Sequence, residues 1–278
     1  MTALALAAPV RAQTASTAVT AGSFLVNVPD GWAEKAIIEN VPLLPLYSKE
    51  DWKAFQADKQ NILKPGYNNR PQHWALRFPS ARPAGVAFDA KEAGDSPAAP
   101  QILIHKADEW GAAGTDGIHE EKPAAEVVKH LRQELKDWRT KDLPNGSPAF
   151  MDAELHFTCL KKPLKFKGGE GIRMITQWTF EPTLATLGEL HYLFLGLSDD
   201  NTCQIIATFP IDLPGLPKAG GQAEHLGRST AHYEELEKHF RDYEADTKKW
   251  LEAHAAEINP SLGLLDEVMQ SLAARHWQ

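Results

Sequence analysis

Two acidic residues, Asp199 and Asp200, stand side by side in residues 195–205 (LGLSDDNTCQI), and Cys203 follows closely. Such a group could bind a cation or supply a pair of catalytic carboxylates. A calcium loop of the EF-hand type needs alternating ligands, a central glycine and a distant glutamate, which this stretch lacks. Asp and Asn are also favoured in tight turns, because their side chains bond nearby backbone amides. The pattern therefore predicts a turn between two strands, with a calcium site as the alternative.

The two cysteines, Cys159 and Cys203, could form a disulfide if the protein is exported to an oxidising compartment. The alternative is two separate buried thiols, which behave as small hydrophobic side chains. Neither cysteine belongs to a CxxC pair, so zinc-ribbon and thioredoxin-type sites are excluded.

Four lysines lie close together in the stretch LKKPLKFKGG, namely Lys161, Lys162, Lys165 and Lys167. A cluster of ammonium groups is typical of an anion-binding patch. Lysines near the end of a strand also hinder pairing with another chain. The sequence leaves both interpretations open.

His225, His232 and His239 recur at intervals of seven within a helical pattern. Positions seven apart on a helix lie about 10.5 Å apart along its axis, too far to share one metal ion. We therefore expect these side chains to face solvent beside an apolar seam. Further histidines are scattered over different elements, where only folding could bring them together: His73, His105, His130, His156 and His191.

The sequence contains no familiar catalytic or nucleotide-binding motif. Residues 196–199 (GLSD) resemble a nucleophile elbow but lack its second glycine, and the IHEEK around His119 is not HExxH. GxxxxGK[ST] and GxGxxG are absent from the chain. We therefore predict no catalytic, metal-binding or cofactor-binding residues and no cofactor, although a site assembled by folding would leave no linear trace.

The chain of 278 residues has an ordinary globular composition and a formal charge of −8. This acidic balance argues against a nucleic-acid partner, whose phosphates favour a basic surface. No apolar run approaches the ~20 residues that span a bilayer, so no transmembrane segment is expected.

Residues 1–22 are interpreted as the remnant of a signal peptide followed by a linker. Residues 4–9 are small and apolar, and Val10, Arg11 and Ala12 fit a small-x-Ala cleavage pattern before Gln13. A disordered alanine-rich tail is the alternative. The first interpretation predicts a periplasmic or secreted protein in which residues 23–278 form a single domain.

Residue periodicity predicts an α+β domain with a central antiparallel sheet of about six to seven strands, flanked by helices. An amphipathic helix is expected at 123–141, and inserted helices at about 48–63 and 221–257. Short connections favour an antiparallel meander in the second half of the sheet. The strand-like runs are 24–28, 73–79, 102–107, 151–160, 171–180, 189–197 and 202–210.

The second insertion is expected to be one long helix, because its apolar residues recur at spacings of three and four. Tyr233, Leu236, Phe240 and Tyr243 should then be buried. Trp110, which precedes a glycine-rich stretch, is expected in an exposed loop.

The order of elements resembles the PsbP-like family. A strand ends in VPDGW, two strands precede a helix, four antiparallel strands follow, and a closing helix carries LDEVMQSLAA. The resemblance covers roughly residues 23–31, 72–210 and 260–275, and the segments 40–70 and 221–257 depart from it. It implies a central antiparallel sheet with helices on its faces and a role in binding or as an accessory subunit. The family has no shared catalytic set, so no residue roles are carried over.

Together these observations predict an exported, non-catalytic binding or accessory protein with an unknown protein or small-molecule partner. The alternative is an extracytoplasmic hydrolase or metal-dependent enzyme whose site is assembled only in the fold. A pocket with converging His, Asp or Glu side chains would favour the enzyme. A broad apolar patch without such groups would favour the binding protein.

The native protein should begin near Gln13, because signal peptidase cuts after a small residue such as Ala12. N-terminal sequencing of protein recovered from its native cells measures this directly. An intact Met1 on protein from the cytoplasm would contradict the prediction.

Overall fold

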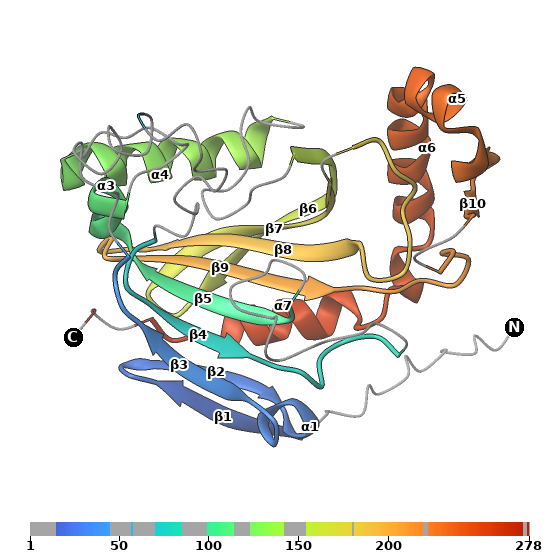
Figure 1. Cartoon of the computed structure of the whole chain (residues 1–278). Coiled ribbons are helices and arrows are strands. Elements are labelled where there is room, and N and C mark those ends of the chain that lie inside the picture. Colours follow the sequence, from blue (N-terminus) through green and yellow to red (C-terminus); the bar gives the residue numbers. More distant parts are fainter. Residues whose placement is uncertain are drawn as a thin grey trace, which may run out of the picture.

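The centre of the fold is a seven-stranded antiparallel sheet with the strand order β3-β4-β5-β9-β8-β7-β6 (Figure 1). The computed structural model describes residues 15–44, 57, 70–84, 99–113, 123–141, 154–179, 181–218, 222–274 and 277. The strands of the sheet are β3 (Ile37–Val41), β4 (His73–Arg77), β5 (Gln101–Lys106), β6 (Glu154–Phe166), β7 (Gly169–Thr179), β8 (Leu190–Ser198) and β9 (Cys203–Pro210). The predicted α+β class, central antiparallel sheet and meander are confirmed.

Helices lie against both faces of the sheet (Figure 1). The α4 face carries α4 (Ala124–Thr140), which confirms the predicted amphipathic helix. The opposite α7 face carries α7 (Leu262–Ser271) and the hairpin of β1 (Ser16–Ala21) and β2 (Phe24–Pro29). The remaining elements are α1 (Asp30–Ala33), η1 (Ala107–Glu109), α3 (Trp110–Ala113), β10 (Glu224–His225), β11 (Arg228–Ser229), η2 (Thr230–His232), α5 (Tyr233–Lys238), α6 (Phe240–Ala253) and η3 (Ala255–Glu257). Within the described ranges, no helix is long and apolar enough to cross a membrane.

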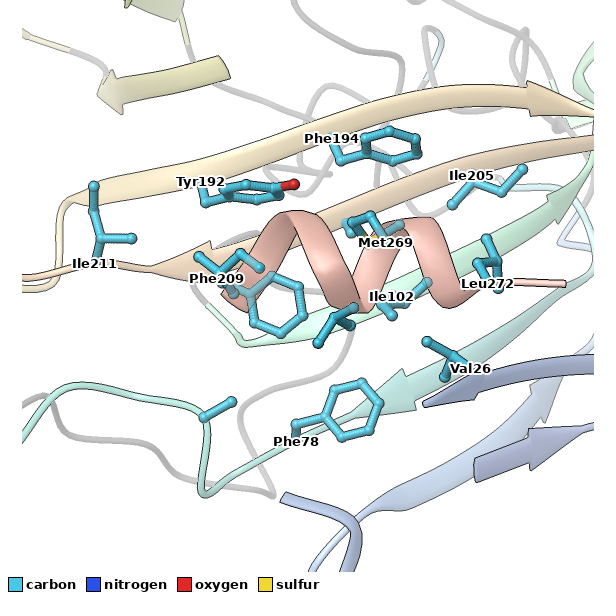
Figure 2. Packing of buried hydrophobic residues seen from close by; sticks show 14 of the residues in the cluster. Val26, Phe78, Ile102, Tyr192, Phe194, Ile205, Phe209, Ile211, Met269 and Leu272 are labelled. Atoms are coloured by element: carbon cyan, nitrogen blue, oxygen red, sulfur yellow. The ribbon is translucent and has the colours of Figure 1, made fainter. Parts of the chain in front are cut away.

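The largest core lies between the sheet and α7. Figure 2 shows Tyr192, Phe194 and Phe209 of the sheet gathered around Met269 of α7, and all four are fully buried. Tyr192 and Phe194 share this face because side chains alternate along a strand, whereas α7 presents residues at helical spacing. Burying one side chain of this size contributes about 1.5–3 kcal/mol.

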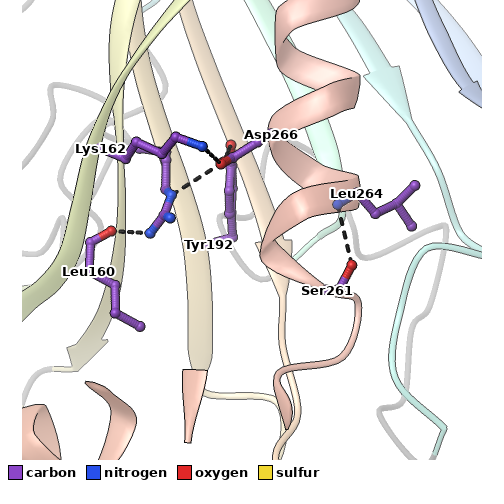
Figure 3. Close-up of polar contacts among 7 residues, drawn as sticks. Leu160, Lys162, Tyr192, Ser261, Leu264 and Asp266 are labelled. Atoms are coloured by element: carbon purple, nitrogen blue, oxygen red, sulfur yellow. Dashed lines mark hydrogen bonds and ion pairs between the residues drawn. The ribbon is translucent and has the colours of Figure 1, made fainter. Parts of the chain in front are cut away.

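A buried carboxylate joins α7 to three strands of the sheet (Figure 3). Asp266 accepts hydrogen bonds from Lys162 Nζ at 2.8 Å and from Arg173 Nε and Tyr192 OH at 3.2 Å each. Arg173 also donates to the backbone carbonyl of Leu160. Leu160 lies in the β6 bulge and has a φ of 51°. Burial, and then the charge of Asp266, raise the pKa of Tyr192, so its hydroxyl stays a donor.

The N-terminal linker was predicted too long, because residues 16–21 form β1. This segment pairs with β2 in a regular antiparallel register. Val19 and Ala21 are buried on its inner side, while Thr20 between them is exposed. The alternation supplies the buried face that a linker lacks. Residues 1–14, including the predicted cleavage site, and nearly all of the expected helix at 48–63 lie outside the described residues.

The long helix expected at 221–257 is divided into a hairpin and two helices. The β10–β11 hairpin turns at Leu226 and Gly227, whose φ values of 49° and 71° are incompatible with a right-handed helix. α5 and α6 are separate because His239 between them leaves the helical conformation, with ψ at 21°. The side chain of Ser229 accepts a hydrogen bond from the Ala231 N–H and starts the helical part.

Division of the helix changes which side chains are buried. Leu236, Phe240 and Tyr243 are buried as predicted, and they pack with Leu184 from the loop between β7 and β8. Tyr233 is 41% exposed, so its predicted burial is wrong. Tyr233 is the first residue of the short helix α5. The apolar spacing of α6 does not continue into α5, because the two helices are separate.

The two cysteines are free, buried and far apart in the sheet. Cys159 lies on β6 and Cys203 on β9, with β7 and β8 between these strands. Neighbouring strands are about 4.8 Å apart, so three steps separate the cysteines by about 14 Å, beyond the reach of a disulfide. The disulfide hypothesis is therefore wrong, and the alternative of two buried thiols holds.

Replacing Asp266 by alanine should lower the free energy of unfolding by about 3–5 kcal/mol, because Arg173 would remain buried without its carboxylate partner. Glu267→Ala is the matched control, since Glu267 is the next residue of α7 and is exposed. It should change the stability by less than ~0.5 kcal/mol. Urea unfolding of both variants measures the difference, and an equal effect of the two would contradict a role for the buried carboxylate.

Candidate functional site

Buried polar side chains of the sheet gather on the α4 face. The apolar members of this face pack with Trp138 of α4: Ala75, Leu103, Ile172, Met174, Leu193, Leu195 and Ile206. Because residues alternate between the faces of a strand, the following buried polar side chains share that face. They are His73, Arg77, Gln101, His105, Thr176, His191, Gln204 and Thr208. On the α7 face the same alternation places only three buried polar side chains of the described strands, Arg173, Gln177 and Ser198, so more of them lie on the α4 side.

Two histidines form the centre of this polar group. His73 on β4 and His105 on β5 are direct register partners, and their ring centroids are 4.7 Å apart. The His105 ring lies 5.2 Å from the ring of Trp110, whose indole N–H donates to Gln204 Oε1 at 2.6 Å. We call these four side chains, from β4, β5, α3 and β9, the imidazole-pair site.

Trp110 was expected to be exposed, but it is only 1% exposed. Its ring belongs to a cluster with Ala107, Val127, Leu131 and Leu197, between α4 and the sheet. Its one polar group is bonded to Gln204, which removes the penalty for burying an indole N–H. The glycine-rich composition of the following residues concealed this packing.

Both imidazoles of the pair are neutral at pH 7. Burial lowers the pKa of His73 to about 4, and it lowers the pKa of His105 well below the usual value. His73 Nδ1 lies 2.9 Å from the carbonyl oxygen of Pro71, which can only accept, so Nδ1 carries the proton and Nε2 the lone pair. Among the described residues, no hydrogen-bond partner meets the buried Nδ1 of His105. The pair can therefore donate to or accept from an uncharged polar group.

A second constellation assembles at the opposite end of the sheet. His156 of β6 lies 2.5 Å from the hydroxyl of Thr179 through Nε2 and 3.4 Å from the carboxylate of Glu244 through Nδ1. This carboxylate–imidazole–hydroxyl order resembles the arrangement that activates a nucleophile. The Thr179 hydroxyl, however, also donates to the backbone carbonyl of Glu181. Since a hydroxyl has one proton, Thr179 then accepts from His156, which is the reverse of nucleophile activation.

The described residues contain no group of three or more His, Cys, Asp or Glu side chains that could hold a metal ion. A small cavity of about 10 Å³ lies between α4 and the sheet, with Glu134 and Gln204 among its lining residues. It has room for about one water molecule.

The four lysines of the expected anion patch do not converge. Lys162 reaches across the α7 face to Asp266, whereas Lys161 lies 5.8 Å from the centroid of the Trp138 ring on the α4 side. Because side chains alternate along a strand, the adjacent Lys161 and Lys162 lie on opposite faces of the sheet. Lys165 and Lys167 are exposed near the β6–β7 hairpin. A single patch of all four is therefore not formed.

Asp199 and Asp200 occupy a turn between β8 and β9, as predicted. Asp200 Oδ1 accepts hydrogen bonds from Ser198 Oγ at 2.6 Å and from the Thr202 N–H at 3.0 Å. Asn201 adopts a φ of 60°, the left-handed conformation that Asn tolerates.

The heptad-spaced histidines have different environments. His232 is exposed and His239 half-exposed, as predicted, but His225 is buried on the β10–β11 hairpin. Its Nδ1 lies 2.7 Å from the hydroxyl of Tyr243, which also accepts from the Ala185 N–H at 2.7 Å. The expectation for His225 is wrong because this residue belongs to a hairpin rather than to the helix.

No protein-family model, curated protein or solved structure matches this chain. The PsbP-like resemblance therefore stays a prediction.

The folded protein should lose stability as the pH falls from about 6.5 to about 4. Burial lowers the pKa of His73, His191 and His225 to about 4, so below pH 6.5 the unfolded chain binds more protons than the folded one. Each such group lowers the unfolding free energy by up to about 1.4 kcal/mol per pH unit in this window. Urea unfolding at pH 7.5, 6 and 5 measures the slope.

The variant His191→Phe should have a shallower slope, because it removes one buried imidazole that stacks on Trp178. His232→Phe is the control, since His232 is exposed. Equal slopes for the two variants would contradict a lowered pKa of His191 in the folded protein.

Proposed function

We propose that the chain is an exported binding or accessory protein without a catalytic step of its own, and that its partner engages the imidazole-pair site. The observation that carries this proposal is the placement of buried polar side chains on the α4 face. Polar groups are unfavourable in a core unless they are hydrogen-bonded, and the α7 face shows how this sheet forms an apolar core. A face that concentrates such groups supports recognition rather than packing alone.

The chemistry of the pair suggests what kind of group it receives. His105 Nδ1 is buried and has no hydrogen-bond partner in the described part of the chain, which is unfavourable unless another polar group meets it. The Trp110 ring lies beside it, is only 1% exposed and belongs to a packed apolar cluster. A small neutral group with one hydrogen-bonding atom fits these features, since the cavity beside Gln204 has room for about one water molecule. Export rests on the cleavage pattern before Gln13 and on the PsbP-like resemblance.

A hydrolase is the second candidate function, and the Thr179–His156–Glu244 constellation favours it. The bond from Thr179 to the Glu181 carbonyl weakens this candidate, because the hydroxyl proton is already committed.

A screen of small, neutral polar fragments tests the binding proposal, with ¹⁵N-labelled histidine rings observed by NMR. Fragments that bind should shift the ring signals of His73 and His105. The ring signals of His225, which contacts Tyr243 and Trp250 of α6 instead, should not change. The variant His105→Phe keeps a ring in place but removes its nitrogens, so it should weaken the same fragments at least tenfold. A screen in which no fragment perturbs the pair, or in which His105→Phe binds equally well, would contradict the proposal.

The same protein, assayed on p-nitrophenyl esters and phosphates with and without Zn²⁺ and Mg²⁺, separates the two candidates. We expect no turnover above background. Turnover that disappears in Thr179→Val and in His156→Gln, with the fold intact, would establish the hydrolase instead.

A further inference from the structure

The positive charges of this acidic chain are concentrated in two segments. Residues 123–141 and 161–170 contain nine Lys and Arg against four Asp and Glu, an excess of five positive charges. The rest of the chain has 20 basic and 33 acidic residues, a net charge of −13. The two segments are α4 and the hairpin end of β6 and β7.

The fold brings these segments together into one surface. Arg139 of α4 pairs with Glu170 of β7 at 3.0 Å, and Lys161 of β6 lies over the Trp138 ring and donates to the Lys141 carbonyl. The apolar side of α4 is buried against the sheet, so its basic side faces outward. We call this the α4–hairpin surface, formed by Lys129, Arg132, Lys136, Arg139, Lys141, Lys161, Lys165 and Lys167.

Four of these cations make no ion pair within the described part of the chain: Lys129, Lys136, Lys165 and Lys167. All four are exposed. Glu170 and Asp137 pair with other members, Arg139 and Lys141. The adjacent turn contributes Asp199 and Asp200, but Asp200 bonds inward to Ser198. The surface therefore offers unpaired ammonium groups interspersed with a few carboxylates.

We infer that the α4–hairpin surface is a docking site for an acidic segment of a partner protein. A partner with spaced carboxylates can meet the lysines and avoid Glu126, Glu170 and Asp199, whereas a uniformly anionic surface cannot. A membrane is disfavoured because Val127, Leu131 and Trp138, the apolar residues of α4, are buried and cannot insert into lipid. The charge of −13 on the rest of the chain opposes a nucleic acid.

Several exposed ion pairs acting together should give weak, fast and salt-dependent binding, because each contributes little in water. A fluorescent twelve-residue peptide of alternating Glu and Ser serves as the probe. We expect binding at 20 mM salt that weakens at least tenfold at 300 mM, since salt screens exposed charges.

The double variants Lys165→Glu/Lys167→Glu and Lys129→Glu/Lys136→Glu should each weaken the peptide at least tenfold. Lys238→Glu/Lys249→Glu is the matched control, because it makes the same charge change on α5 and α6, away from this surface. The control should stay within twofold of the wild type. A control that loses as much affinity, or a wild type that does not bind at 20 mM salt, would overturn the proposal.

Vesicles containing phosphatidylserine and a DNA duplex are tested in parallel. If vesicles or DNA bind more tightly than the peptide, and the Lys165→Glu/Lys167→Glu variant loses this binding, the partner is a membrane or a nucleic acid rather than an acidic protein segment. The His105→Phe variant should bind the peptide normally, so this proposal and the imidazole-pair proposal can fail independently.

Discussion

The buried carboxylate of Asp266 is the interaction on which the arrangement of this fold depends. Its three donors come from β6, β7 and β8, and they lie between 74 and 104 residues away in the chain. A charge withdrawn from water is tolerated only when several donors reach it together. This requirement fixes the position of α7 on the sheet. It also fixes the β6 bulge, because Arg173 must meet both Asp266 and the Leu160 carbonyl.

The two faces of the sheet bury different kinds of side chain. The α7 face closes over an apolar core that contains the two ion pairs of Asp266, whereas the α4 face collects neutral imidazoles, amides and hydroxyls. The outer side of α4 and the β6–β7 hairpin together gather eight cations in an otherwise acidic chain. The apolar core and the two proposed binding regions thus lie on opposite sides of one sheet, so substitutions that test binding on one side need not disturb the core on the other.

The sites were much less predictable than the elements that position them. His73 and His105 could not be paired from the sequence, because 32 positions and an intervening loop separate them and only the β4–β5 register makes them neighbours. The one available signal was their alternation with Ala75 and Leu103, residues of the apolar α4 face. Lys162 and its neighbours were grouped as one patch because they are close in the sequence, although alternation along a strand places Lys161 and Lys162 on opposite faces of the sheet.

The sequence by itself determined the local elements: the alternating strands, the helix after Pro123, and the Asp-Asp-Asn turn. These follow from contacts between residues a few positions apart, where the periods of 2 and 3.6 are visible. Only the tertiary structure decided the strand order that separates Cys159 from Cys203 and the burial of Trp110 and His225. It also decided the break at His239 and the partners of Asp266. These features depend on which distant segments pack together, and that choice minimises the free energy of the whole chain rather than of any single stretch.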